Sequence, residues 1–351
     1  MSKTTLVTPN SSNPCAGAFP GHLDVMFTNK CNAKCAWCIE KNGWHPTERV
    51  AAAKLAAKAV SLNPTQVNIL GGEPTQEYAE LYTFIQQVRR FSPAKISITS
   101  NVTNLPTLLG VGADYYNLSI HHYDPRHDGR IKGLANPLFH VGPNDVATFI
   151  RRVGAGRVRF NCTVHSDGIH TKAGIDRYVQ WATGLGVKHI RFAELQCCTK
   201  DEGYISLRDL MGQSIPADPF TEGCCTEVGY GGVTIQYRTS CGIVCPAKSL
   251  PGGGQYSQPG GTLGVLYYDG SHFDTWQKVG KYMNQHEIIR LLQLVKDGDV
   301  TVTGAAKILA GAQPTEASSI ENAGNCHPGR RPVRAEASCH GGGCHGRRGG
   351  C

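Results

Sequence analysis

Three cysteines stand close together near the start of the chain, in the stretch Cys31-Asn-Ala-Lys-Cys35-Ala-Trp-Cys38. They follow a short apolar run, Leu23–Phe27, which is typical of a buried strand. Thiolates at such close spacing are typical of a metal site or a redox centre. A closed structural metal site uses four ligands, whereas three ligands leave one coordination position open for substrate or solvent. The spacing therefore predicts a metal site with an open position.

A second motif, Gly71-Gly72-Glu73-Pro74, directly follows another apolar run, Gln66–Leu70. The carboxyl ends of parallel strands meet on one face of an α/β fold, so the two motifs are expected to share a site. Glycine has no Cβ, which lets the backbone approach a ligand closely. Cys-x3-Cys-x2-Cys followed one strand later by Gly-Gly-Glu-Pro resembles the radical S-adenosylmethionine (SAM) superfamily.

This resemblance implies a defined set of cofactors. In that family, three thiolates bind three irons of a [4Fe-4S] cluster, and the amino and carboxylate groups of SAM chelate the fourth iron. The implied cluster ligands are Cys31, Cys35 and Cys38. The residues implied to bind SAM are Trp37, beside the adenine, and the turn Gly71, Gly72, Glu73 and Pro74, near the methionine ammonium. From cysteine spacing alone, the alternative is a zinc knuckle that takes its fourth ligand from elsewhere.

Polar residues also stand at the ends of later apolar runs. By the same resemblance, Asn101 and Ser119 match positions that hold the ribose or carboxylate of SAM, and Glu194 is placed to bind SAM or substrate. The alternative for each is an ordinary polar residue in a turn at the end of a strand. His121, His122 and Tyr123 follow the fourth run and are substrate-pocket candidates, with local hydrogen bonding as their alternative. No pair of residues is assigned as a conventional acid and base.

Strand-like and helix-like segments alternate from residue 22 to residue 195. The predicted strands cover 23–27, 66–70, 95–99, 115–120, 158–164 and 188–192, and the predicted helices cover 47–62, 76–91, 105–109, 144–153 and 173–185. This alternation predicts a parallel sheet with right-handed crossovers. A closed barrel needs eight such units. The expected fold is therefore α/β, an open, partial (β/α)6 TIM-like barrel with a Cys-rich C-terminal extension and a disordered tail.

The expected organisation has four parts: a lead-in over 1–21, the barrel core over 22–195, the Cys-rich extension over 196–300 and a low-complexity Gly/Arg/Cys/His tail over 311–351. Short β-like runs are expected at 232–238 and 262–268, with a last helix over 284–296. An auxiliary iron–sulfur cluster in the extension would take its ligands from Cys224, Cys225, Cys241 and Cys245. Structural zinc or simple thiols are the alternatives.

The formal net charge of +8 gives little support for nucleic-acid binding. From residue 326 onward there are five arginines against one glutamate, so half of the excess lies in the tail. The rest of the chain carries no dense Lys/Arg stripe with interleaved aromatics. The sequence shows neither a signal peptide nor an apolar run of membrane-spanning length, and a cytoplasmic protein without membrane partners is expected.

The sequence thus predicts an enzyme that reductively cleaves SAM to a 5'-deoxyadenosyl radical, which abstracts hydrogen from a small-molecule or nucleotide-like substrate. The stretches LSIHHYD (118–124) and GIDRYVQWATGLGVKHIRFAEL (174–195) resemble the MoaA-like branch, the molybdenum-cofactor cyclisation type. The implied electron donor is a flavodoxin- or ferredoxin-like protein. The alternatives are a peptide- or protein-modifying radical SAM enzyme with an auxiliary cluster, and a non-enzymatic zinc-binding module.

Overall fold

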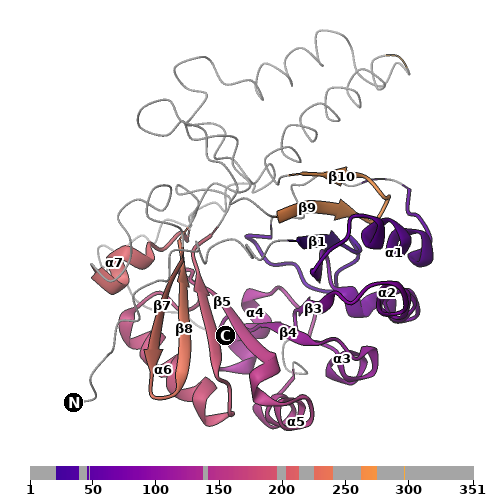
Figure 1. The fold of residues 1–351 in the computed structure, drawn as a ribbon. Coiled ribbons are helices and arrows are strands. Elements are labelled where there is room, and N and C mark those ends of the chain that lie inside the picture. Colours follow the sequence, from indigo (N-terminus) through magenta and orange to yellow (C-terminus); the bar gives the residue numbers. More distant parts are fainter. Residues whose placement is uncertain are drawn as a thin grey trace, which may run out of the picture.

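A single ten-stranded sheet organises the protein, in the order β10-β9-β1-β2-β3-β4-β5-β6-β8-β7 (Figure 1). The computed structural model describes residues 21–38, 46, 48–136, 141–195, 203–212, 225–239, 262–274 and 296. Within these residues β10 and β7 are separate edges, so the sheet is open. The expected open, partial barrel is confirmed.

All six strands predicted for the barrel core are present. They are β1 (His22–Met26), β2 (Gln66–Leu70), β3 (Lys95–Ser100), β4 (Tyr115–Ser119), β5 (Val158–Thr163) and β6 (His189–Ala193). Each strand pairs in parallel with the next strand along the chain. Their carboxyl ends therefore meet at one rim of the sheet, where both sequence motifs lie.

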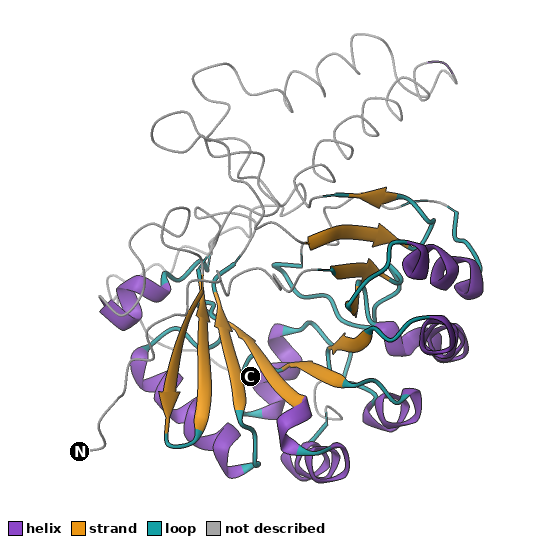
Figure 2. Cartoon of the chain, in the orientation of Figure 1, coloured by secondary structure: helices purple, strands orange, loops and turns teal. Residues whose placement is uncertain are grey.

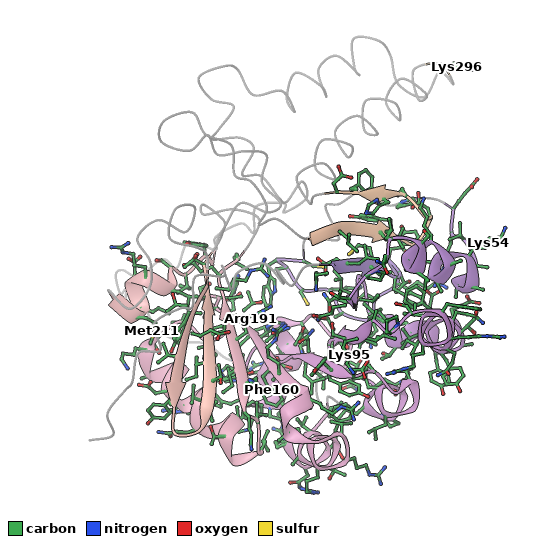
Figure 3. All side chains as sticks on the ribbon, in the orientation of Figure 1. Lys54, Lys95, Phe160, Arg191, Met211 and Lys296 are labelled. Carbon is green, nitrogen blue, oxygen red and sulfur yellow. The ribbon has the colours of Figure 1, made fainter. Side chains whose placement is uncertain are left out.

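Helices α1, α2, α3 and α5 follow one another along the outer side of the curved sheet (Figures 1 and 2). The helices between the six strands are α1 (Ala52–Ser61), the 3-10 turn η2 (Pro74–Glu77), α2 (Tyr78–Phe91), α3 (Leu105–Val111), α4 (Pro125–Ile131), α5 (Pro143–Val153), the 3-10 turn η4 (Ala155–Arg157) and α6 (Lys172–Gly184). Helix α2 buries Leu81, Phe84, Ile85 and Val88, one stripe at the spacing of an amphipathic helix. Side chains from the helices and the sheet fill the space between the two layers (Figure 3).

The chain beyond residue 196 extends both edges of the same sheet. Strand β8 (Val233–Arg238) pairs in parallel with β6, and β9 (Thr262–Tyr267) pairs in parallel with β1. These two strands agree with the β-like runs expected at 232–238 and 262–268. The edge strands β7 (Cys225–Tyr230) and β10 (His272–Phe273), together with helices α4 and α7 (Leu207–Met211), were not anticipated from the sequence. The helix expected over 284–296 lies outside the described residues apart from residue 296.

The two faces of the sheet differ in polarity. Leu23, Val25 and their apolar neighbours form one core with the helices. On the opposite face, Asn68 on β2 donates from Nδ2 to Asp24 on β1 at 2.8 Å and accepts from Ser97 on β3 at 2.9 Å. Asn117 on β4 continues this row by donating to Asn68 at 3.5 Å. The inner face of the partial barrel therefore carries a row of hydrogen-bonded polar side chains across its first four strands.

Among the described residues, no helix combines the length and the apolar character that crossing a membrane requires.

Candidate metal and cofactor site

The cysteine loop, residues 27–38, begins where β1 ends and packs directly on the Gly71-Gly72 turn. The amide of Glu73 donates to the carbonyl of Lys30 at 2.7 Å. Both glycines have positive φ, +89° and +32°. A Cβ on Gly72 would collide with the carbonyl oxygen of Lys30 and lie 2.9 Å from that of Thr28. The glycines thus permit close approach to the loop backbone. The sequence predicted that they make room for a ligand, and it did not predict this contact within the protein.

The three cysteines of this loop lie near the surface, with Cys31 exposed and Cys35 and Cys38 half-buried. The sulfur of Cys31 accepts from the amide of Ala33 at 3.4 Å and from the side-chain amide of Asn101 at 3.9 Å. N–H donors directed at a sulfur favour its thiolate form, which is the metal-binding form. Cys31 therefore sits in surroundings suited to a metal ligand.

Glu73 is fully buried, and its carboxylate is held by protein donors. Oε1 accepts from the amide of Thr75 at 3.1 Å, its hydroxyl at 2.7 Å and the hydroxyl of Ser100 at 3.0 Å. Oε2 accepts from the amide of Asn101 at 2.6 Å. Burial raises the pKa of Glu73, and these hydrogen bonds oppose the increase. The carboxylate thus connects the ends of β2 and β3. Pro74 begins the 3-10 turn η2. Binding of SAM by Glu73 or Pro74 stays a prediction.

The structure brings Asn101, but not Ser119, to the cysteine loop. The side-chain amide of Asn101 donates to the side chain of Asn32 at 2.8 Å as well as to Cys31. Ser119 is half-buried at the last position of β4, opposite Asn161 of β5. Binding of SAM by either residue remains untested.

Trp37 of the cysteine loop lies between two imidazoles. Its ring contacts His121 edge-on, with centroids 5.4 Å apart, and His165 in a tilted arrangement, at 4.7 Å. The Nδ1 atom of His121 accepts from the amide of Thr163 at 3.0 Å, and that of His165 accepts from the amide of Asp167 at 3.1 Å. Both side chains are buried. These bonds hold each ring as the neutral Nε2–H tautomer, a hydrogen-bond donor rather than a base.

Sequence reasoning did not single out His165. The signal was available, because His165 comes directly after the fifth predicted strand, in the position where His121 follows the fourth. The buried His121 also donates from its own amide to Asp128 at 2.6 Å, in helix α4. His121 thus takes part in local hydrogen bonding, which was the alternative to a role in the substrate pocket.

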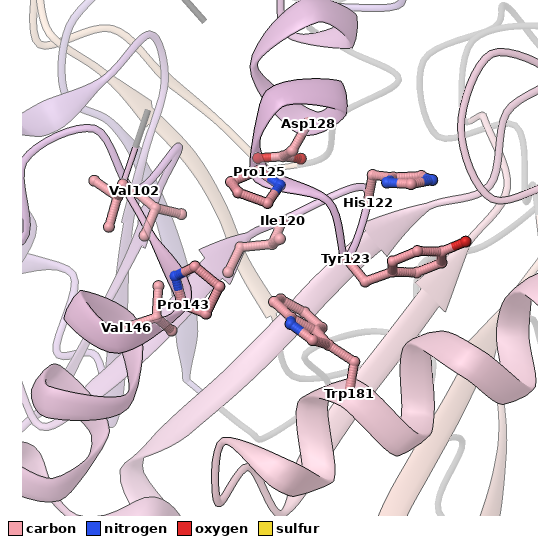
Figure 4. A pocket seen from close by; sticks show the side chains of 10 residues that line it. Val102, Ile120, His122, Tyr123, Pro125, Asp128, Pro143, Val146 and Trp181 are labelled. Carbon is pink, nitrogen blue, oxygen red and sulfur yellow. The ribbon is translucent and has the colours of Figure 1, made fainter. Parts of the chain in front are cut away.

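His122 and Tyr123 line a cleft of about 670 Å³ that reaches the cysteine loop at Lys34 and Trp37. Its other walls are helix α4 and residues 166–171. A second cavity, of about 10 Å³, also touches His122 and Tyr123 and is otherwise mostly apolar (Figure 4). That volume holds about one water molecule. Of these two cavities, the larger has room for a substrate.

Glu194 anchors the segment that follows β6. Its carboxylate accepts from the hydroxyl of Tyr204 at 3.0 Å and from the amide of Leu207, the first residue of α7, at 2.8 Å. Among the auxiliary-cluster candidates, Cys225 opens β7, while Cys224, Cys241 and Cys245 lie outside the described residues. The role of Glu194 toward SAM and the auxiliary cluster stay predictions.

The imidazole of His122 makes folding stability dependent on pH. Burial and the neighbouring His127, stacked at 4.2 Å, lower the pKa of His122 from its usual 6.5. As the pH falls, the unfolded chain therefore binds this proton first, and stability is lost from about pH 6.5 downward. Between about pH 8 and pH 5, we expect the melting temperature of His122→Gln to fall by less than that of the parent. His170→Gln, at an exposed imidazole of the same cleft, is the matched control, and equal losses in both variants would contradict the assignment.

Known proteins resemble this chain over part of its length. Residues 25–152 match the family model described as the Radical SAM superfamily. A GTP 3',8-cyclase of Hydrogenovibrio crunogenus is 29% identical over 122 residues, which cover 31% of this chain and 37% of the relative. GTP 3',8-cyclase 2 of Mycobacterium tuberculosis is 31% identical over 123 residues, which cover 32% of this chain and 34% of the relative. The chain thus matches about a third of the length of these curated relatives.

Two solved structures show more distant similarity. SuiB of Streptococcus suis bound to S-adenosylmethionine has a TM-score of 0.45 and 18% identity, covering 64% of this chain and 51% of that one. A radical SAM methyltransferase from Sphaerobacter thermophilus has a TM-score of 0.45 and 14% identity, covering 61% of this chain and 64% of that one. The matched family region contains both the cysteine loop and the Gly71-Gly72 turn that packs on it. Through this region the chain is similar to the radical SAM superfamily, and over about a third of its length it is similar to the GTP 3',8-cyclases, of the MoaA-like branch.

Proposed function

We propose that this protein is an enzyme that reductively cleaves SAM and uses the resulting radical to abstract hydrogen from a small-molecule or nucleotide-like substrate. One observation carries the proposal. Within the family-matched region, a loop with Cys31, Cys35 and Cys38 follows β1 and rests on the Gly-Gly turn that follows β2. The superfamily's cofactors are a [4Fe-4S] cluster and SAM.

The donor set of the cysteine loop suits such a cluster. In a [4Fe-4S] cluster each cysteine thiolate binds its own iron. Cys31, Cys35 and Cys38 would therefore hold three irons. When bound, the cluster supplies the electron that cleaves SAM into methionine and the 5'-deoxyadenosyl radical.

The protein's own residues would bind SAM and orient it beside this loop. Trp37, fixed between His121 and His165, offers an aromatic surface to the adenine. The carbonyls of Gly71 and Gly72 are candidate acceptors for the ammonium, because the carboxylate of Glu73 is already hydrogen-bonded within the protein. Asn101, already beside Cys31, and Ser119 are the candidates for the ribose or carboxylate.

A polar substrate suits the surroundings of the loop. The inner face of the sheet carries the row of Asp24, Asn68, Ser97 and Asn117, and the 670 Å³ cleft is lined by imidazoles and by Lys34. The curated relatives, named for a reaction of GTP, favour a nucleotide-like compound. Residues 196–300 would cap the substrate, and a flavodoxin- or ferredoxin-like protein would donate the electron, in the cytoplasm.

The direct test is anaerobic reconstitution of the full chain with iron and sulfide, reduction with dithionite and measurement of 5'-deoxyadenosine formed from SAM. We expect cluster absorbance and SAM-dependent product in the parent and neither in Cys31→Ala. If Cys31→Ala matches the parent, or the parent forms no 5'-deoxyadenosine, the proposal fails. Deuterium appearing in 5'-deoxyadenosine from a labelled candidate substrate would then identify the hydrogen donor.

A further inference from the structure

A buried ion pair, formed by Lys132 and Asp128, lies next to the cysteine loop. Lys132 and Asp128 are 0% and 1% exposed, and Lys132 Nζ lies 2.6 Å from Asp128 Oδ2. Taking both charges out of water is costly, and apolar residues in place of a buried pair are often as stable or more so. Stability alone therefore does not explain this pair. The hydrogen bonds that the two side chains make to other residues indicate its role.

The pair connects the ends of three strands. Lys132 Nζ donates to the carbonyl of Asn101, after β3, at 3.0 Å. Asp128 Oδ1 accepts from the amide of His121, after β4, at 2.6 Å. The backbone carbonyl of Lys132 accepts from the amide of Lys34, in the loop after β1, at 2.7 Å. Gly133 packs equally closely, since a Cβ there would lie 2.9 Å from the carbonyl oxygen of Lys34.

The backbone of Asn101 is consequently held on both sides by buried side chains, those of Glu73 and Lys132. Its amide donates to the carboxylate of Glu73, and its carbonyl accepts from the ammonium of Lys132. Its side chain reaches Cys31, where Nδ2 is 3.9 Å from the sulfur. Hydrogen bonds to cysteine sulfur and nearby charge both set the potential of an iron–sulfur cluster. Hydrogen bonds and positive charge stabilise the reduced form, which is the more negative one.

We propose that Lys132, held by Asp128, is a positioning residue that fixes Asn101 against Cys31 and thereby raises the reduction potential of the cluster on the loop. This inference rests on the proposed function, because it requires a cluster at Cys31, Cys35 and Cys38. Lys132 acts through Asn101 and through the backbone of the loop.

The test is a redox titration of the reconstituted full chain, followed by electron paramagnetic resonance. Lys132→Met is expected to make the potential more negative by at least a tenfold change in the reduction equilibrium, about 59 mV for one electron. Asp128→Asn/Lys132→Met keeps an acceptor for the His121 amide and leaves the net charge unchanged. It is expected to shift the potential in the same direction by less, because only the grip on Asn101 is lost.

Lys172→Met is the matched control. Lys172 pairs with Asp176 at the same four-residue helical spacing, but the two side chains are 63% and 56% exposed. The reduction potential of the cluster in Lys172→Met is expected to equal that in the parent. In the cluster-free chain, hydrogen exchange over residues 28–38 is expected to accelerate in both Lys132 variants and not in the control.

The outcomes separate this inference from the proposed function. If the parent loads a cluster and cleaves SAM, but the potentials of both Lys132 variants equal that of Lys172→Met, the positioning role is wrong while the proposed function stands. Faster exchange without a change of potential reduces Lys132 to a structural residue and also overturns the inference. A parent chain that takes up no cluster overturns both proposals.

Discussion

Cys35→Ser is expected to abolish 5'-deoxyadenosine formation and the cluster absorbance of the cysteine loop. A thiolate binds iron, whereas a serine hydroxyl stays protonated at neutral pH and is a poor ligand. The loop supplies only three cysteines, so losing one leaves two protein ligands for the cluster. Iron per chain should fall by about four, the content of one [4Fe-4S] cluster.

Cys162→Ala is the control for this experiment. Cys162 is fully buried on β5, and burial raises the pKa of its thiol well above the usual range. It should therefore remain a thiol that binds no iron, and its replacement should leave cluster content and SAM cleavage intact. Full activity in Cys35→Ser would contradict the assignment of the loop. About four irons remaining in Cys35→Ser, without SAM cleavage, would instead reveal a second cluster, with Cys224, Cys225, Cys241 and Cys245 as its candidate ligands.

Gly72→Ala is expected to destabilise the cluster-free protein by about 2–5 kcal/mol and to prevent cluster loading. An L side chain at the φ of +32° observed here costs about 1–2 kcal/mol. The new Cβ would also collide with the carbonyl oxygen of Lys30, and relieving such overpacking typically costs about 1–3 kcal/mol more. Because the obstructing atoms belong to the backbone of the cysteine loop, the loop must move. Urea unfolding and iron content measure the two effects.

Gly184→Ala provides the comparison for this variant. Gly184 is exposed at the end of α6, and a Cβ there would meet nothing within 4 Å. Alanine in a helix is favoured over glycine by about 0.5–1 kcal/mol, so this variant should be as stable as the parent or slightly more stable. If Gly72→Ala matched Gly184→Ala in both stability and iron content, the contact between the turn and the loop would be needed neither for stability nor for cluster loading.

Local signals in the sequence account for the strands and for the placing of both motifs. The run Gln66–Leu70 coincides with β2, because alternating burial along a strand appears directly as alternating residue types. Helix α4 escaped prediction because DPRHDGRI has no apolar stripe. Its start was marked only by Asp124, whose side chain caps the helix by accepting from the amides of Arg126 and His127, and by Pro125 at the first helical position.

Other features depend on contacts between distant parts of the chain. Strand β9 inserts beside β1, more than two hundred residues earlier, and no local pattern specifies that pairing. Glu73 looked like a ligand of SAM in its motif, but folding surrounds it with donors from the ends of β2 and β3. The same holds for Lys132, an ordinary polar residue in the sequence that folding buries completely.

By itself the sequence determined the parallel sheet, the order of its first six strands and the rim on which Cys31, Cys35 and Cys38 stand. These follow from the spacing of residues near one another in the chain, and such spacing acts before any long-range contact forms. Only the tertiary structure decided what surrounds the cysteine loop: the imidazoles against Trp37, the glycines beneath Lys30 and the buried pair behind Asn101. Those contacts join residues from different strand ends, and their energies exist only once the sheet has brought the ends together.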